Sequence, residues 1–153
     1  MHETPAIRAV LNKEKESFLA MAKQYFIELN PLFVPHEDWE AQYFESLQSN
    51  ENLSLRWIIL GEDLVGFIIF GVENHRFLSR KTGVIYELYI LPEYRGQGIA
   101  QTSAVQVVNE LHQYGISKVQ LEVTEGNTRA VAFWERLGFQ KVSSRYILQD
   151  QRK

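Results

Sequence analysis

The sequence contains no cysteine, which excludes disulfide bonds, thiolate metal sites and a cysteine nucleophile. No apolar run approaches the roughly 20 residues that a membrane-spanning helix needs, and the first residues lack the charged-then-apolar pattern of a secretory signal. Neither sign of charge predominates, since a net charge of −3 provides no basic field for nucleic acid or an anionic membrane. These absences predict a cytoplasmic protein without nucleic-acid or membrane partners.

Two familiar kinds of active site are also missing from the sequence. The four histidines show no paired ligand spacing, so no metal site is expected. No G-x-S-x-G sequence is present, so the nucleophile elbow of the serine hydrolases is absent. The composition is that of an ordinary globular protein, with 45% apolar and 23% charged residues in a chain of 153. We expect one compact domain over residues 1–153.

The hydrophobic pattern changes period several times along the chain. Apolar residues at helical spacing predict helices near residues 13–30, 35–47, 100–111 and 127–137. Strand-like runs occupy residues 55–60, 64–72, 84–91 and 118–123, and two short final strands are expected at residues 140–142 and 145–148. This order of helices and strands favours a mixed α/β or α+β domain.

The most informative stretch runs from Glu87 to Ala100, where an apolar strand leads through a proline and a glycine turn into a helical pattern. Gly96 and Gly98 remove side chains at the turn, so several backbone N–H groups can point outward together. The helix that follows favours an anion at its N-terminus, and Arg95 adds a permanent forked cation. The stretch therefore predicts a cradle for phosphate or pyrophosphate, although a tight turn packed on a sheet would explain the glycines alone.

The amino-acid sequence of this turn excludes two common phosphate-binding motifs. The dinucleotide fingerprint needs a third glycine where Gln101 stands, and the P-loop needs a lysine that does not follow these glycines. The segment from Arg95 to Ala100 reads [QR]-x-x-G-x-[GA] and resembles the pyrophosphate loop of the GNAT family of N-acetyltransferases. The segment from Asn127 to Phe139 resembles that family's N-x-x-A-x-x-x-[YF]-x-x-x-G-F motif, on the helix that flanks the cofactor. The resemblance covers residues 84–142.

The resemblance implies a GNAT-like fold, an α/β (α+β mixed) architecture whose central, mostly antiparallel sheet is flanked by helices and has a splayed strand pair at the cofactor. It also implies transfer of an acetyl group from acetyl-CoA to the primary amine of a small-molecule or peptide acceptor by direct attack, with a homodimer as a common assembly. The cofactor-binding residues that it implies are Tyr89, Ile90, Arg95, Gly96, Gln97, Gly98, Ile99, Ala100, Asn127 and Trp134.

Glu87 is the expected catalytic residue. Strand alternation places it on one face with Ile85, Tyr89 and Leu91, so that a carboxylate interrupts an apolar row. Partial burial would raise its pKa toward neutrality, which suits a general base, and many members of the family place a glutamate on this strand. Two alternatives remain: a carboxylate at a solvated sheet edge, or one that binds a cationic acceptor without taking a proton.

Trp134 departs from the family pattern. A tyrosine often stands at this position and protonates the leaving CoA thiolate, whereas an indole N–H cannot act as an acid. Either another acid serves, with Tyr89 and Tyr146 as candidates, or the thiolate leaves unassisted, since a free thiol has a pKa of only about 8.5. The departure leaves open a non-catalytic acyl-CoA-binding sensor or interaction module. An unrelated phosphate-binding α/β domain is the remaining alternative.

Overall fold

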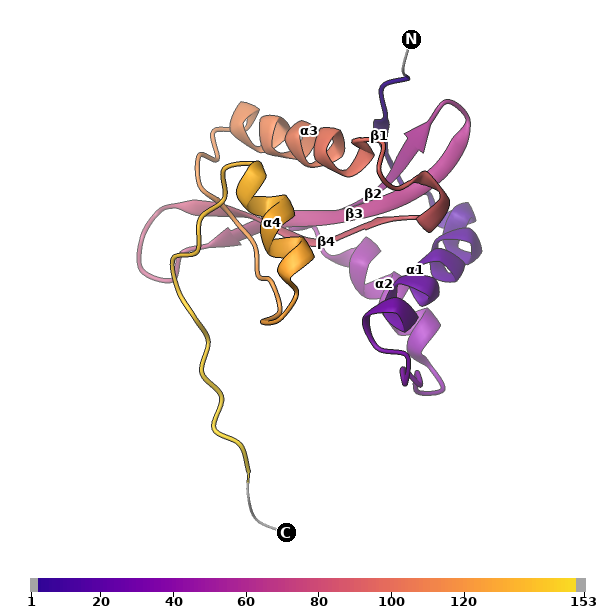
Figure 1. The fold of residues 1–153 in the computed structure, drawn as a ribbon, viewed down its shortest axis with the longest axis horizontal. Helices are drawn as coiled ribbons and strands as arrows, with labels where there is room; N and C mark the ends of the chain where they lie inside the picture. Colours follow the sequence, from indigo (N-terminus) through magenta and orange to yellow (C-terminus); the bar gives the residue numbers. More distant parts are fainter. Residues whose placement is uncertain (1–2, 151–153) are drawn as a thin grey trace. The chain divides into compact units, whose positions relative to one another are not determined.

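The structure is a computed structural model that describes residues 3–150, and its chain divides into two compact units, Met1–Glu122 and Val123–Lys153. Figure 1 shows the course of the chain. The elements of the first unit are, in order, β1 (Ala6–Ala9), η1 (Asn12–Glu14), α1 (Lys15–Leu29), α2 (Trp39–Ser49), β2 (Leu53–Leu60), β3 (Asp63–Asn74), β4 (Lys81–Ile90), η2 (Pro92–Tyr94), α3 (Ile99–Gln113) and β5 (Val119–Gln120). The second unit holds α4 (Thr128–Arg136).

The first unit is built on one five-stranded sheet with the strand order β1-β2-β3-β4-β5. The first three pairs are antiparallel and the last, β4 with β5, is parallel. That last pairing joins only Gly83 to Val119 and Val84 to Gln120, so the rest of β4 has no strand on this edge among the described residues. The expected mixed, mostly antiparallel sheet with one splayed strand pair is confirmed.

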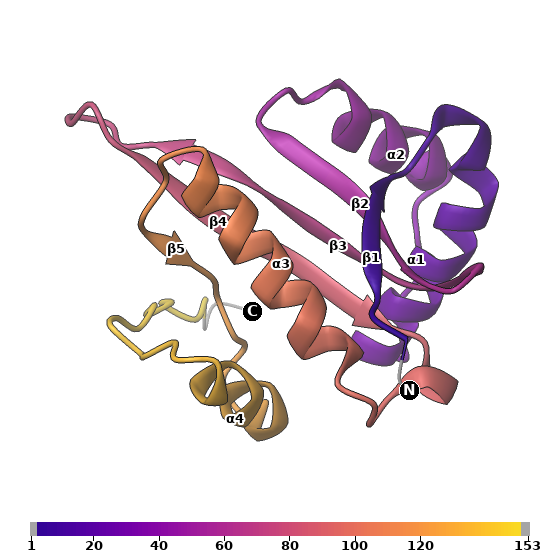
Figure 2. The ribbon, with the colours of Figure 1, turned by 90° about the horizontal axis from the view of Figure 1, so that it is seen from above.

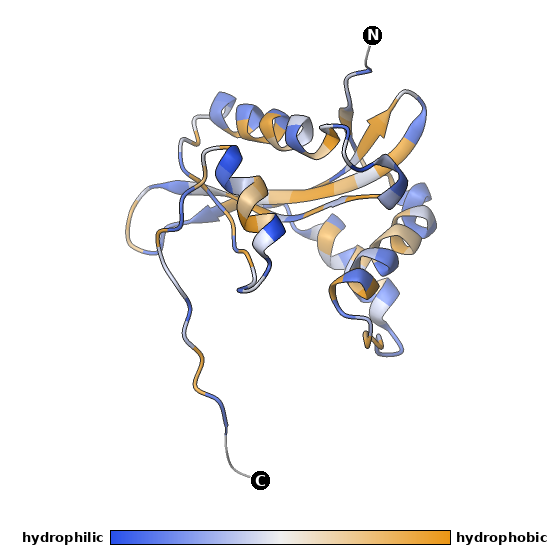
Figure 3. Ribbon diagram, viewed as in Figure 1, coloured by the Kyte–Doolittle hydropathy of each residue, from blue (hydrophilic) through white to orange (hydrophobic). Residues whose placement is uncertain are grey.

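Helices cover both faces of this sheet, with α1 and α2 on one side and α3 on the other (Figures 1 and 2). Aromatic rings fill the space beneath α1 and α2, where Phe18 packs edge-on against Phe67 at a centroid distance of 5.1 Å. On the opposite face, α3 packs closely against the sheet at Gly83. A β carbon at that position would lie only 2.8 Å from the side chain of Leu111. In the first unit the middles of the strands are mostly apolar, whereas α1, α2 and α3 carry both polar and apolar residues (Figure 3).

The end of the chain differs from the expectation. Residues 139–150 form no strand, so the expected strands at residues 140–142 and 145–148 are wrong. Their apolar side chains stand in solvent, with Val142, Tyr146 and Leu148 at 90%, 93% and 96% exposure. A strand exists only where a neighbouring strand satisfies its backbone groups, and alternating apolar residues indicate the propensity for pairing without supplying the partner.

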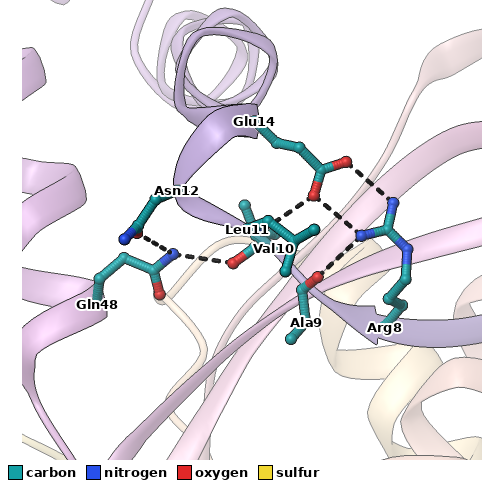
Figure 4. Close-up of polar contacts among 7 residues, drawn as sticks. All are labelled: Arg8, Ala9, Val10, Leu11, Asn12, Glu14 and Gln48. Atoms are coloured by element: carbon teal, nitrogen blue, oxygen red, sulfur yellow. Dashed lines mark hydrogen bonds and ion pairs between the residues drawn. The ribbon is translucent and has the colours of Figure 1, made fainter.

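A polar cluster fastens β1 to the helices that follow it (Figure 4). Arg8 donates two hydrogen bonds to the carboxylate of Glu14, at 2.9 and 3.0 Å. The same carboxylate accepts the backbone N–H of Leu11 at 2.9 Å, and Gln48 of α2 donates to the carbonyl of Val10 at 2.9 Å. The turn between β1 and α1 is thereby held from both sides.

Replacing Glu14 should reduce stability in a pH-dependent manner. The hydrogen bonds from Arg8, and next that from Leu11, lower the pKa of Glu14 to about 2. Its stabilising effect is therefore fully present above the ordinary carboxyl pKa and is lost as pH falls from about 4.5 to about 2. We expect Glu14→Gln to lower the midpoint of thermal unfolding by about 1–3 °C at pH 7, with the difference from wild type vanishing near pH 2. Glu45→Gln, which removes an exposed carboxylate of α2, is the matched control for the loss of one negative charge.

Candidate active site

The glycine turn lies between η2 and the start of α3. The 3-10 turn is closed by hydrogen bonds from Tyr94 N–H to the carbonyl of Leu91, at 2.9 Å, and from Arg95 N–H to that of Pro92, at 3.2 Å. Beyond it, Gly96 and Gly98 adopt left-handed conformations with φ of 79° and 78°, which other residues adopt only with strain. A β carbon at either position would meet no atom within 4 Å, so the backbone here borders open space.

This turn carries a run of unpaired backbone donors. In the part of the chain that the structure describes, the six consecutive N–H groups of residues 96–101 have no hydrogen-bond acceptor, and the first one paired is that of Thr102, which donates to Gly98 at 3.1 Å. The first turn of α3 contains no acidic residue and no side chain caps it. The donors and the positive end of the helix dipole are thus both available to an anion, as the sequence predicts.

Arg95 turns back from this loop toward β4 and α1. Its Nε donates to the carbonyl of Ile90 at 2.9 Å, and its Nη2 forms an ion pair with Glu28 at 2.7 Å. The guanidinium lies over the ring of Tyr89, 5.5 Å from the centroid. In this position Arg95 bonds to the end of β4 and to α1, and its contact with a cofactor stays a prediction.

Beside this ion pair runs an open groove of about 550 Å³ between α1 and the end of β4. We call it the α1 groove. Its lining includes Met21, Gln24 and Glu28 of α1, Tyr89 of β4, and Leu91 and Glu93 just after that strand. It therefore combines apolar walls with two carboxylates.

A β-bulge decides where Glu87 points. On β3, Ile69 pairs with Glu87 and the next residue, Phe70, pairs with Ile85, so Tyr86 is an extra residue in β4. Successive residues of β3 point to opposite faces, and their partners do the same. The expectation that Glu87 shares a face with Ile85 is therefore wrong, because strand alternation takes no account of a bulge. Glu87 does share the face of Tyr89, as expected, and this face is covered by α1 and α2.

Glu87 is half-buried on this face, and burial raises the pKa of its carboxyl to about 7. Within residues 3–150, no side chain forms a hydrogen bond or an ion pair with that carboxyl. A carboxyl that titrates near neutrality and has no fixed partner can accept a proton from a ligand. The electrostatic condition expected for a general base at this position is present.

The second unit contains the other motif. Asn127 caps α4, its Oδ1 accepting the N–H of Ala130 at 3.1 Å. Gly138, with φ of 100°, ends the helix. The ring of Trp134 packs against Phe133 and Phe139 at centroid distances of 4.8 and 5.4 Å. Cofactor contacts by Asn127 and Trp134 stay predictions from the motif.

Glu28 belongs to this region although no motif in the sequence marks it. It ends a row of α1 residues at helical spacing, Ser17, Met21, Gln24 and Glu28, all of which line the α1 groove. That spacing is readable in the sequence. The pairing with Arg95, 67 residues later, is not.

Comparison with known families identifies the class of protein. The model of the Acetyltransferase (GNAT) family matches residues 16–139, which is most of the chain. The chain belongs to the GNAT family of acetyltransferases.

Solved structures share its fold at low sequence identity. A ribosomal-protein-alanine N-acetyltransferase from Brucella melitensis biovar Abortus 2308 is 18% identical with a TM-score of 0.77, over 96% of this chain and 99% of that one. Aminoglycoside N-acetyltransferase AAC(6')-Iy, solved with CoA, is 16% identical with a TM-score of 0.78, over 99% and 98%. A transcriptional regulator from Bacillus halodurans C-125 is 18% identical with a TM-score of 0.78, over 95% and 99%. At these identities the likeness establishes the fold.

None of the helices in residues 3–150 is both long and apolar enough to cross a bilayer. No three histidine, aspartate or glutamate side chains in that range gather into a group able to hold a metal ion.

The burial of Glu87 should be detectable as a cost in stability at high pH. Its pKa in the folded protein lies above the ordinary value, so stability is highest below about pH 4.5 and falls as pH rises toward 7, where the folded protein must carry the buried charge. We expect Glu87→Gln to be more stable than wild type by about 1–2 kcal/mol at pH 8 and equally stable near pH 4. Urea unfolding at both pH values measures this. Equal differences at pH 4 and pH 8 would contradict it.

Proposed function

We propose that this protein is an N-acetyltransferase that moves an acetyl group from acetyl-CoA to a primary amine by direct attack, with both substrates bound together. The observation that carries the proposal is the run of six unpaired N–H groups over the open glycine turn at the start of α3. Membership of the GNAT family supports acetyl transfer in general. The family match extends across the boundary between the two units, which supports a single functional domain formed by residues 1–153.

The pyrophosphate of the cofactor would be held by backbone donors of Gly96, Gln97, Gly98, Ile99 and Ala100. Because no strand of residues 3–150 pairs with this edge of β4 beyond Val84, main-chain groups near Tyr89 and Ile90 are proposed to pair with the amide-bearing pantetheine arm, as an added strand would. The motif assigns Asn127 and Trp134 to the same cofactor. That assignment rests on the sequence.

Glu87 would serve as the general base, directly or through a water that it orients. An amine is protonated near pH 7 and must lose a proton before its nitrogen can attack. Glu87 precedes the end of β4 by three residues, about 10 Å of strand, and its carboxyl titrates at about 7. Acetyl-CoA supplies the thioester that the amine attacks. No covalent enzyme intermediate is involved, and positioning of the two reactants provides much of the acceleration.

A protein acid for the leaving thiolate is not part of this proposal. The indole of Trp134 cannot supply a proton. Of the two tyrosine candidates, Tyr146 is 93% exposed, and Tyr89 is enclosed by the rings of Phe67 and Tyr25 at 5.8 and 5.4 Å. A thiolate is a tolerable leaving group without assistance, because a free thiol has a pKa of about 8.5.

The acceptor is proposed to be a cationic amine of a small molecule or peptide. Glu28 and Glu93 place two carboxylates in the α1 groove, on the side of β4 that Glu87 faces. Two of the structural neighbours act on such groups: one is a ribosomal-protein-alanine N-acetyltransferase, and AAC(6')-Iy was solved with the bisubstrate analogue CoA-S-monomethyl-acetylneamine. A homodimer, common in the family, belongs to the same proposal.

A second candidate function is a non-catalytic acyl-CoA sensor, which Trp134 favours because it removes the usual acid. Release of free CoA thiol, followed over a panel of amines, separates the two. Turnover on any amine supports the enzyme. Tight CoA binding without turnover on the whole panel supports the sensor.

Gly98→Val should weaken CoA binding by at least ten-fold in calorimetry. A β-branched residue is strained at a φ of 78° and its side chain would occupy the space in front of the unpaired donors. Gly115→Val is a matched control, because Gly115 has a φ of 82° and also faces open space, but ends α3 at the opposite terminus. The control should lose similar stability and bind CoA as wild type does. Equal affinity of Gly98→Val and wild type would rule out the cradle.

Glu87→Gln should change the pH dependence of turnover. In the wild type, kcat/KM should fall about ten-fold per pH unit below about pH 7, as the carboxyl becomes protonated. In the variant that inflection should disappear, leaving only the ionisation of the amine, and kcat at pH 8 should drop by about 100-fold or more. A variant that retains both the inflection and the rate would show that Glu87 is not the base, whatever it contributes to acceptor binding.

A further inference from the structure

Arg95 stands between two sites that attract opposite charges. It directly precedes the six unpaired N–H groups of the glycine turn, which suit an anion. Its guanidinium is nevertheless engaged with Glu28 of α1, whose carboxylate lines the α1 groove. The Arg95–Glu28 ion pair therefore connects the glycine turn with the α1 groove.

The geometry shows what holds Arg95 on the α1 side. The Nε bond to the carbonyl of Ile90 and the 2.7 Å bond from Nη2 to Glu28 both draw the guanidinium toward α1 and β4. While this pair persists, the charge of Arg95 is neutralised by Glu28 and its attraction for a second anion is reduced. The side chains of Arg95 and Glu28 are 34% and 41% exposed, so the pair is of the weak, solvent-screened kind.

We propose that Glu28 competes with the cofactor phosphates for Arg95, so that cofactor binding separates the Glu28–Arg95 pair and leaves the Glu28 carboxylate facing the α1 groove. This inference rests on the proposed function, which supplies the anion. A cationic amine that engages Glu28 would release Arg95 and so strengthen cofactor binding. Because coupling between two ligands is reciprocal, the bound cofactor would strengthen binding of the amine by the same factor. Glu28 would thus act on the cofactor through Arg95, without touching it.

The opposite arrangement would give the opposite result. If Glu28 instead held Arg95 in the orientation that the cofactor needs, removing Glu28 would weaken cofactor binding. The sign of the effect of one substitution on CoA affinity therefore separates competition from support.

The experiment is a calorimetric titration of CoA into wild type, Glu28→Gln, Arg95→Gln, the double variant and Glu93→Gln. Glu93 lines the same groove, and its replacement removes the same charge without breaking the bond to Arg95. We expect Glu28→Gln to bind CoA about two- to five-fold more tightly than wild type, the range that an exposed ion pair allows, and more tightly than Glu93→Gln. Arg95→Gln should bind CoA more weakly, and in that background Glu28→Gln should bring no further gain beyond that of Glu93→Gln.

Three results would overturn the inference: weaker binding by Glu28→Gln, the same affinity for Glu28→Gln and Glu93→Gln, or an undiminished gain from Glu28→Gln in the absence of Arg95. Each leaves the proposed function standing, because CoA still binds. Failure of the wild type to bind CoA would instead remove the proposed function and this inference together. Thermal unfolding of every variant verifies that each one is folded.

Discussion

The pairing of β3 with β4 is the constraint on which the rest of the site depends. β4 carries Glu87, leads into the glycine turn and provides the open edge, so its register against β3 sets all three at once. In a sheet, a shift of one residue moves every side chain to the opposite face. The extra residue at Tyr86 produces such a shift part way along β4. It leaves Ile85 on the face of α3 and turns Glu87 toward the face of α1 and α2, where a carboxyl is partly desolvated.

The position of α3 depends on contacts at its far end. Glu110 receives two hydrogen bonds from Arg56 of β2, at 3.0 and 2.8 Å, and Arg56 in turn lies over the ring of Phe70. Leu111 occupies the space that the missing side chain of Gly83 leaves on β4. These contacts fix the last turns of α3 on the sheet, and the buried side chains of Ile99 and Ala104 hold its first turns there as well. Packing along the whole helix thus fixes the direction of the unpaired donors at its start.

Much of this arrangement could be predicted, because it depends on the local amino-acid sequence. The order of helices and strands follows from apolar spacing, the left-handed turn from Gly96 and Gly98, and the cap of α4 from Asn127. What could not be predicted depends on partners far along the chain. The bulge at Tyr86 requires knowledge of β3, and the pair of Arg95 with Glu28 joins residues 67 positions apart.

The error at the end of the chain has the same origin. The apolar residues at 140–142 and 145–148 describe segments able to pair, and the described residues form no strand there. Conversely, Glu14 stabilises the turn after β1 through hydrogen bonds from Arg8 and Leu11, and no sequence motif indicates these bonds. Propensity is read from a segment alone, whereas pairing and pKa are properties of its surroundings.

The unpaired first turn of α3 also has a consequence for how long the protein survives. A helix start with no capping side chain and no acidic residue lacks part of the stabilisation that other helices carry in their own sequence. Any anion held there adds stability that grows with the logarithm of its concentration once that concentration exceeds the dissociation constant. Since proteolysis acts on opened chains, the abundance of the folded protein would follow the supply of its own ligand.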